Sequence, residues 1–381
     1  MTRHFLISGI GPSHFGVGRL MAALVPRASA RGYEVLYGPT LRPLASYLSN
    51  RDLYRIPLDV VVWAIAKLIF RTRVMALRDA DVIAIHPQTI GWGPFLLLCA
   101  RNRVTMYVVD NSFFCIRSYN HKNGQLAESL DCLGDVDRCD PECMPYPVRY
   151  ARSENIRYLK EFAQLSGKLS FLVQNRFQGE LLERHLDHGV PWRIVGMRTD
   201  EFDEDLMTDR GSQEELPLAD VVYHGASVEA KGVCYVLEMA RRLPDVSFLI
   251  PDDRSRVECI PSCGEIPDNV HFREMTWESG LSVQVSHCRL VICPSLWSAP
   301  IEGALLKSLL FNGNVAVYHA ALSFQAELPD GLVSRLDKDL ERSAGMLRAA
   351  LDLPADRREF NRRWIRAFID QMDMDSVFQK P

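Results

Sequence analysis

The chain has 381 residues, of which 47% are hydrophobic and 24% are charged. At a prior of about 150 residues per domain, this length predicts two domains, and the composition excludes both a single small module and a disordered protein. Lysine and arginine total 44 against 48 aspartate and glutamate residues, a net charge of −4 that argues against binding nucleic acid by counterion release.

The N-terminal sequence runs directly into an apolar strand pattern without a secretory leader, and we expect a cytoplasmic protein. The longest apolar stretch, residues 56–70, is interrupted by Asp59 and Lys67 and is shorter than the ~20 residues that cross a bilayer. Ten cysteines are too sparse for a disulfide framework, so we expect mostly free thiols and assign Cys259 and Cys263 no role.

Apolar strand patterns alternate with helical patterns in the first half of the chain. Residues 5–10 predict a strand, followed by a loop that contains Gly16 and by a helix. The loop departs from the G-x-G-x-x-G pattern, so it is a weak dinucleotide fingerprint. Further strands are predicted at 32–38, 80–86, 104–110 and 169–174, and helices at 153–165 and 178–186. This alternation predicts a parallel sheet covered on both faces.

The segment 58–78 is a helical pattern rich in apolar residues that also carries basic side chains, including Lys67 and Arg71. One interpretation is a surface helix that makes peripheral contact with an anionic membrane. The other is a helix buried against the first sheet, and we favour burial.

Residues 111–147 lose the alternating rhythm and form an irregular excursion from the sheet, rich in Asn, Asp, Cys and Pro. Four cysteines lie within it, and four thiolates can close a structural zinc site. These cysteines are Cys115, Cys132, Cys139 and Cys143. Because their spacing fits no strong C-x-x-C pattern, we favour ordinary thiols over metal ligands.

The segment 198–216 is acidic, polar and poor in large apolar residues, which indicates a linker between domains. A second α/β series follows, with strands at 220–225, 246–251, 270–272 and 289–293 and a helix at 233–243. The final segment, 357–381, has aromatic residues at helical spacing among arginines and predicts a terminal helix that packs on the body and could cross back to the first domain.

The carboxyl ends of the strands in two such domains would face a shared cleft, where ligands bind in open parallel sheets. Residues 293–317 read as a strand, a turn, a helix start and a further strand. Pro300 suits a first helical turn, with Ser298 or Ala299 as the cap. The free amides and dipole of such a helix start favour a pyrophosphate ligand.

Residues 294–317, PSLWSAPIEGALLKSLLFNGNVAV, resemble the donor-binding motif of retaining GT-B glycosyltransferases that use nucleotide sugars, the group 1 or family 4-like enzymes. Residues 222–233 and 268–272 look like the family's preceding strands and its Lys-Gly pair. The resemblance extends over most of the chain and is specific between 222 and 317. It implies two doubly wound Rossmann-like domains facing a cleft, with an acceptor-side domain at 1–197 and a donor-binding domain at 217–356.

By this resemblance, Lys231 would pair with the donor phosphates, and Gly16 and Gly225 would let the backbone approach them. His86 would lie on the acceptor side, near the sugar. Alternatives that stay open are a solvated loop lysine at 231, a hydrogen-bonded strand-end histidine at 86 and a simple tight turn at Gly16.

The motif also departs from the family pattern. The family's arginine after the glycine is Ala226 here, and its paired glutamates fall on Ser298 or Ala299 and on Leu306 or Lys307. The donor site implied by the resemblance is therefore altered, and Lys307 could supply the charge of the missing arginine.

Glu302 is the carboxylate that remains at this helix start, where it would bind sugar or ribose hydroxyls or cap the helix. The resemblance assigns donor binding to Ser298, Pro300 and Ile301 as well. His86 and Glu302 are thus the candidate catalytic residues.

The activity implied is transfer of a sugar, with retention, from a nucleotide-sugar donor to a glycan or lipid-linked acceptor in surface polysaccharide or glycoconjugate assembly. We expect no metal and no cofactor, because helix amides and a lysine can stabilise the departing diphosphate and no Asp-x-Asp pair follows a strand. A lipid-linked acceptor would place the protein at the inner face of a membrane. Alternatives are a non-catalytic subunit that binds a glycan or a partner glycosyltransferase, and a nucleotide-sugar epimerase or hydrolase.

Overall fold

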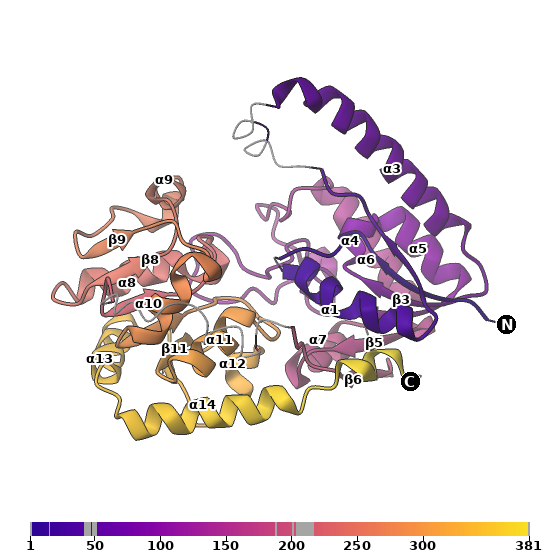
Figure 1. The fold of residues 1–381 in the computed structure, drawn as a ribbon. Coiled ribbons are helices and arrows are strands. Elements are labelled where there is room, and N and C mark those ends of the chain that lie inside the picture. The colour runs from indigo at the N-terminus through magenta and orange to yellow at the C-terminus, as the bar shows by residue number, and fades with distance from the viewer. Residues whose placement is uncertain are drawn as a thin grey trace.

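The computed structural model describes residues 2–14, 16–41, 47, 52–186, 189–199, 202 and 217–379. They form two lobes, each built on one sheet (Figure 1). Most of the linker predicted at 198–216 lies outside the described residues, which include only 198, 199 and 202 of it.

The N-terminal lobe contains a six-stranded sheet in the order β2-β1-β3-β4-β5-β6. All its strand pairs are parallel, with Ile7 of β1 in register with Leu36 on one side and Ala84 on the other. The strands are β1 His4–Ser8, β2 Glu34–Tyr37, β3 Asp81–Ile85, β4 Arg103–Tyr107, β5 Leu169–Val173 and β6 Trp192–Ile194. The helices are α1 Gly16–Ala30, α3 Ile56–Ala76, α4 Pro87–Ile90, α5 Trp92–Arg101, α6 Arg152–Leu165 and α7 Arg176–Leu186.

The C-terminal lobe repeats this plan with the order β12-β11-β10-β7-β8-β9, again all parallel. Its strands are β7 Val221–Tyr223, β8 Phe248–Ile250, β9 Val270–Phe272, β10 Leu290–Cys293, β11 Val315–Tyr318 and β12 Ser334–Leu336. Its helices are α8 Val233–Arg242, α9 Arg254–Glu258, α10 Leu281–His287, α11 Gly303–Phe311, α12 Phe324–Glu327 and α13 Leu340–Ala350. The central strands are buried apolar runs, as expected for sheets covered on both faces. The prediction of two doubly wound parallel sheets is confirmed.

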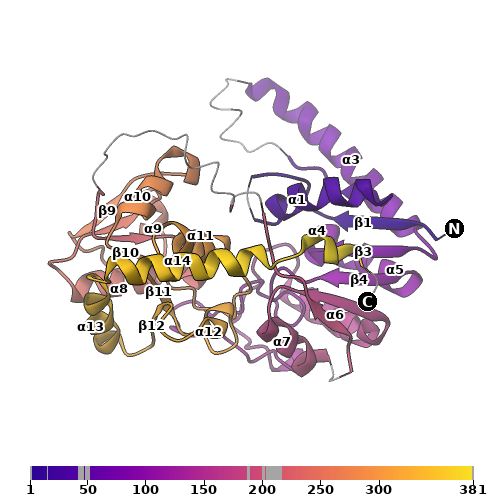
Figure 2. The same ribbon diagram turned by 60° about the horizontal axis from the view of Figure 1, so that its bottom comes forward.

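The last helix, α14 Ala355–Asp370, packs on α11 in the C-terminal lobe and points toward the N-terminal lobe (Figure 2). The chain then buries Met374 and Val377 in a cluster with Leu6 and Leu20 of the N-terminal lobe. Arg193 of β6 donates hydrogen bonds to the carbonyls of residues 376 and 379. The end of the chain is therefore part of the first lobe.

Helix α3 differs from the favoured prediction of a helix buried against the first sheet. Only Phe70 and Val74 of its described side chains are buried, and Figure 1 shows the helix along the outer edge of the lobe. Large apolar side chains such as Leu58 and Leu68 are 64% and 63% exposed. Apolar periodicity alone could not tell a covered helix from an uncovered one. Among the described residues, no helix is both long and apolar enough to span a membrane.

The cysteines follow the expectation of mostly free thiols, with one exception. Cys263, which was expected to have no role, forms a disulfide with Cys234 of α8. In the 111–147 excursion, Cys132 contacts both Cys115 and Cys139, and Cys139 contacts Cys143. In the part of the chain that is described, however, no three His, Cys, Asp or Glu side chains are arranged to hold a metal ion.

Candidate functional site

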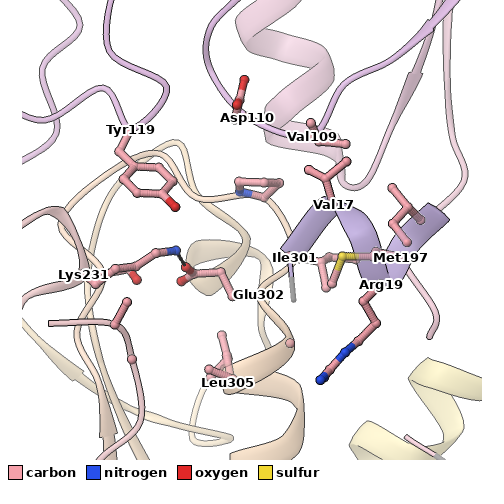
Figure 3. A pocket seen from close by; sticks show the side chains of 18 of the residues that line it. Val17, Arg19, Val109, Asp110, Tyr119, Met197, Lys231, Ile301, Glu302 and Leu305 are labelled. Carbon is pink, nitrogen blue, oxygen red and sulfur yellow. Dashed lines mark hydrogen bonds and ion pairs between the residues drawn. The ribbon is translucent and has the colours of Figure 1, made fainter. Parts of the chain in front are cut away.

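A cavity of about 650 Å³ lies between the two lobes (Figure 3). The residues that follow several strands line it, among them His86 after β3, Asp110 after β4, Gly225 after β7 and Ser295 after β10. The carboxyl ends of both parallel sheets therefore face one space, which is where ligands bind in open α/β sheets. The cavity is the candidate functional site.

Lys231 reaches the cavity on a loop that is held in place by Tyr223 and by the backbone at Pro294. The hydroxyl of Tyr223 lies 2.6 Å from the carbonyl oxygen of Ala226 and 3.2 Å from that of Lys231. Gly232 follows with φ +82°, and a Cβ placed there would lie 2.1 Å from the carbonyl oxygen of Pro294. Only glycine fits this turn. The Lys-Gly pair thus sets the position of the lysine against the loop after β10.

The ammonium group of Lys231 lies against three side chains. It forms an ion pair with Glu302, whose side chain is 13% exposed, while that of Lys231 is 17% exposed. It also lies 4.8 Å from the ring centre of Tyr119, as Figure 3 shows. The ring centre of Trp297 is 4.7 Å away. Burial opposes the charge of this lysine, but Glu302 outweighs it and raises the pKa of Lys231. The alternative of a solvated loop lysine is wrong.

The helix after Trp297 begins later than predicted. Helix α11 starts at Gly303 with Glu302 as its N-cap residue, so Pro300 lies before the helix and neither Ser298 nor Ala299 caps it. The predicted start is wrong because Ser298 has tertiary partners. Asn120 donates to its hydroxyl at 3.0 Å and accepts from its amide at 3.1 Å.

Ser298 is accordingly buried and does not line the cavity. The amide of Asn111 also donates to its carbonyl oxygen, at 2.8 Å. Of the residues expected to bind the donor at this helix start, Pro300 and Ile301 line the cavity, and so do Gly303 and Ala304 of the first turn of α11. The amide end of the helix therefore faces the cavity, one turn later than expected.

A second cation, Lys307, lines the cavity from the next turn of α11. Its ammonium group lies 4.4 Å from the ring centre of Trp277. Burial, reinforced by the nearby Arg19, lowers the pKa of Lys307 to about 8, with Glu278 acting in the opposite sense. Arg19 comes from α1 of the other lobe and lies 4.0 Å from Glu278. This side of the cavity thus combines positive charge from both lobes.

His224, the residue after β7, was not singled out by the sequence. Its ring stacks on Trp277 with centroids 5.3 Å apart, and its Nδ1 lies 2.9 Å from the hydroxyl of Ser308. Burial and the neighbouring Lys307 lower the pKa of His224 to about 3. The imidazole is therefore neutral at ordinary pH and separates Ser308 from the cavity.

His86 lies at the end of β3 in the left-handed region, with φ +57°. Its Nε2 lies 3.2 Å from Oδ2 of Asp110 and its Nδ1 lies 3.1 Å from the hydroxyl of Thr89. That hydroxyl also donates to the carbonyl oxygen of His86 at 2.9 Å, so Asp110 and Thr89 hold the ring from both sides. Burial opposes the charge of Asp110, but His86 and Ser112 outweigh it and lower the pKa of Asp110. The hydrogen-bonded side chains of His86 and Asp110 thus line the N-terminal side of the cavity.

The two glycines expected near the phosphates both line the cavity. Gly16 opens α1 with φ +49°, and a Cβ there would meet nothing within 4 Å, so the requirement is one of backbone conformation. A Cβ on Gly225 would lie 2.7 Å from the hydroxyl of Tyr223. Gly225 therefore keeps the 225–231 loop close to the strand end.

The sequence predicted the 111–147 excursion but not that it crosses to the C-terminal lobe. Besides Tyr119 and Asn120, the amide of Gly124 donates to Glu229 at 3.0 Å, and Glu128 accepts from the amide of Ala321 at 2.9 Å. The excess of Asn and other polar residues was the available signal, because buried amides bridge segments that lack regular structure.

Comparisons with known proteins bear on the fold. No protein-family model and no curated protein matches the chain. Among solved structures, sucrose-phosphate synthase from Thermosynechococcus elongatus superposes with a TM-score of 0.63 at 13% identity, covering 98% of this chain and 96% of that one.

An α,α-trehalose-phosphate synthase (UDP-forming) from Burkholderia xenovorans in complex with glucose-6-phosphate gives a TM-score of 0.57 at 14% identity, with 99% and 98% of the two chains covered. WaaG, a glycosyltransferase involved in lipopolysaccharide biosynthesis, gives 0.52 at 13% identity, with 98% and 97% covered. The chain shares one architecture with these proteins over nearly its whole length, and the GT-B fold expected from the sequence is confirmed.

Proposed function

We propose that the protein is a glycosyltransferase that moves a sugar from a nucleotide-sugar donor to a glycan or lipid-linked acceptor, with retention and without a metal ion. The observation that carries the proposal is the meeting of Lys231 with the first turn of α11 in a cavity between the carboxyl ends of two parallel sheets. An ammonium group and free helix amides suit a diphosphate. The similar folds of known glycosyltransferases support it.

In this proposal, the diphosphate of the donor lies at the start of α11 between Lys231 and Lys307. As the bond from the anomeric carbon to the phosphate oxygen breaks, negative charge grows on the leaving group, and the two lysines and the α11 amides stabilise it. These positive groups supply the charge that a metal ion would otherwise provide. Gly16 and Gly225 leave room for the phosphates beside the backbone.

Glu302 and the His86–Asp110 pair are proposed to act on the sugar and the acceptor. Glu302 already holds Lys231, and a second carboxylate oxygen is left to accept from a sugar or ribose hydroxyl. His86 lies on the N-terminal wall with Asp110 behind it. We assign His86 to the acceptor side, near the transferred sugar. Ser298 is withdrawn from the donor-binding set, because Asn120 and Asn111 occupy its polar atoms.

The same proposal places the protein in the cytoplasm, in surface polysaccharide or glycoconjugate assembly. A lipid-linked acceptor would bring it to the inner face of a membrane, with segment 58–78 in peripheral contact. The exposed apolar side chains of α3 support that contact.

A second candidate is a non-catalytic subunit of the same fold that binds a glycan or a partner glycosyltransferase. The observation in its favour is the altered motif: Ala226 stands where the family pattern has arginine, and the paired glutamates fall on Ser298 or Ala299 and on Leu306 or Lys307. The polar atoms of Ser298 are also engaged in packing. It predicts binding of a nucleotide or glycan with no turnover under any condition.

The test is a thermal-shift screen against nucleoside diphosphates of each base and their sugars. A ligand that binds only the native state raises the unfolding free energy by about 2.7 kcal/mol at a hundred times its dissociation constant. We expect one base to stabilise the protein, and its sugars to be consumed when a cell-envelope extract supplies the acceptor. Stabilisation without turnover would favour the non-catalytic subunit, and no stabilisation by any nucleotide would contradict both the donor site and the function.

A further inference from the structure

Two buried side chains on the N-terminal wall of the cavity have polar atoms that no other part of the described chain satisfies. Ser118 is 4% exposed and Gln174 is 3% exposed, and both residues line the cavity. Among the described residues, neither the hydroxyl of Ser118 nor Oε1 of Gln174 has a hydrogen-bond partner. Buried polar atoms are nearly always paired, so these two atoms point to a ligand that supplies the missing hydrogen bonds.

Both residues are held against the segment that follows β4. The amide of Asn111 donates to the carbonyl oxygen of Ser118 at 3.0 Å, and Nε2 of Gln174 donates to that of Val108 at 3.4 Å. Because a carbonyl oxygen can only accept, this contact fixes Nε2 of Gln174 and leaves Oε1 as the atom without a partner. Asp110 belongs to the same segment and also lines the cavity. The two unsatisfied atoms therefore belong to the wall that carries the candidate catalytic pair.

Tyr146 adds an aromatic surface next to Ser118. Its amide donates to the carbonyl oxygen of Ile116 at 3.2 Å, and its carbonyl oxygen accepts from the amide of Ser118 at 2.7 Å. The ring centre lies 5.6 Å from that of Tyr119 and 5.7 Å from the guanidinium carbon of Arg117. Tyr146 is nevertheless 37% exposed and lines the cavity. The excursion thus holds this residue in place and leaves part of it open to a ligand.

The chemistry of this wall suits sugar hydroxyls better than a phosphate. Oε1 of Gln174 can only accept, the hydroxyl of Ser118 can donate or accept, and a sugar hydroxyl can do both. Asp110, whose pKa is lowered, adds a negative charge that disfavours a second anion nearby. The C–H face of a pyranose ring can pack on an aromatic ring such as that of Tyr146. Arg149, which is exposed and also lines the cavity, is the group that an anionic ligand would use instead.

We propose that this wall binds an uncharged pyranose ring, with one ring hydroxyl donating to Oε1 of Gln174, another bonded to the hydroxyl of Ser118, and the C–H face on Tyr146. The inference rests on the proposed function only in making this ring the acceptor. The accepting end is then a neutral sugar unit of a glycan or glycolipid, and not a sugar phosphate. Ser118 and Gln174 determine specificity through atoms that the fold itself does not use.

The experiment measures binding of neutral methyl pyranosides and of hexose 6-phosphates to the full chain by ligand-observed NMR, with and without nucleoside diphosphate. The pyranosides have the gluco, galacto and manno configurations and include 2-acetamido derivatives. Ser118→Ala removes one unsatisfied atom, and Gln174→Met removes the other at a similar side-chain length. The matched control is Ser166→Ala, in the same lobe. Ser166 is also 4% exposed, but its hydroxyl donates to the carbonyl oxygen of Ala163 at 2.7 Å.

We expect at least one neutral pyranoside to bind, and Ser118→Ala and Gln174→Met each to weaken it by about three- to tenfold, the range for one neutral hydrogen bond. Urea denaturation should show that Ser118→Ala keeps or raises the free energy of unfolding, because its hydroxyl has no protein partner to lose. Ser166→Ala should lower that free energy and leave pyranoside affinity unchanged. A monodeoxy pyranoside that lacks the hydroxyl bound by Ser118 should bind wild type more weakly than its parent, but should bind Ser118→Ala as well as the parent does.

Equal pyranoside affinity in the wild type, Ser118→Ala and Gln174→Met would overturn the proposal. A preference for the 6-phosphates that Arg149→Gln abolishes would do the same, because the wall would then select an anion. A loss of stability in Ser118→Ala as large as in Ser166→Ala would also overturn it, since the hydroxyl would then serve the fold.

The two ligands separate this inference from the proposed function. Pyranoside binding without nucleotide binding would overturn the donor site and leave the sugar site standing. Nucleotide binding without pyranoside binding would overturn the sugar site and leave the donor site standing.

Discussion

Two lysines flank the start of α11, and their surroundings differ in kind. Lys231 has an anionic partner in Glu302 and two aromatic rings against it, and its pKa is raised. Lys307 also lies on an aromatic ring, but its cationic neighbour is Arg19 from the other lobe, and its pKa falls to about 8. Lys231 therefore stays positively charged, whereas the charge on Lys307 depends on pH. Residue type alone does not say which of the two lysines stays charged.

Substitution of Lys231 is the strongest test of this difference between the two lysines. Lys231→Met should weaken nucleoside-diphosphate binding by about 30- to 100-fold, about 2–3 kcal/mol, because a charge-assisted contact is lost. Isothermal titration calorimetry measures the change. Since the substitution also leaves Glu302 unpaired, Lys231→Met/Glu302→Gln is the control, and it should recover part of the loss. Unchanged affinity in Lys231→Met would remove this lysine from the site.

The Lys231 side depends on the excursion that brings Tyr119 to it. Asn120→Ala removes buried hydrogen bonds to Ser298, Asn111 and the carbonyl oxygen of Ser129. We expect a loss of about 2 kcal/mol in the free energy of unfolding, because partners on both lobes are left unsatisfied. Urea denaturation measures it, with the exposed Asn123→Ala as the control. A loss below about 0.5 kcal/mol would show that Asn120 does not join the lobes.

The Glu302→Gln substitution tests whether Glu302 acts on the substrate or only holds Lys231 in place. The amide keeps the size of the side chain but removes the anion, so nucleoside-diphosphate binding should hold or strengthen while sugar transfer falls by about 10- to 30-fold, about 1.5–2 kcal/mol. Steady-state kinetics and calorimetry on one preparation give the two values, and circular dichroism checks the fold. Equal losses in both would mean that Glu302 acts only by holding the lysine.

The Lys307 side should respond to pH. Its pKa of about 8 means that the ammonium form, which attracts a phosphate, prevails at pH 7 and is lost as the pH rises through 8. Diphosphate affinity should therefore fall by up to about tenfold between pH 7 and 9, a contribution of about 1.4 kcal/mol. Lys307→Arg should flatten the profile, because arginine stays charged. A profile that is identical in both proteins would assign the pH dependence to another group.

The fold could be predicted because apolar strands alternate with helices in both halves, and the Lys-Gly turn at 231 could be predicted from a motif. The start of α11 could not be predicted. Pro300 is acceptable in a first helical turn, but Ser298 is held by Asn120, which lies 178 residues earlier in the chain. This contact between the lobes overrides the local preference for an earlier helix start. No local stretch of sequence contains both partners of the contact.

The position of Tyr119 and the exposure of the predicted helix α3 could not be foreseen, for other reasons. Tyr119 lies in a segment without periodicity, so neither its direction nor its partner could be read from spacing. The α3 residues have periodicity, but the pattern says that a face is apolar and not what covers it. Only the exposed fractions of side chains such as Leu58 distinguish a helix packed on both sides from one packed on a single side.

The return of the chain to the first lobe bears on how the lobes can rotate. Gly196 leaves the N-terminal lobe beside Met372, which comes back toward it: a Cβ on Gly196 would lie 2.9 Å from that side chain. The two passages of the chain between the lobes therefore lie side by side, and a rotation of one lobe against the other would be centred there. The Asn120–Ser298 bonds lie elsewhere, in the excursion that bridges the lobes. A rotation that widens the cavity would therefore strain the bonds by which the excursion holds the C-terminal lobe, Asn120–Ser298 and Gly124–Glu229 among them.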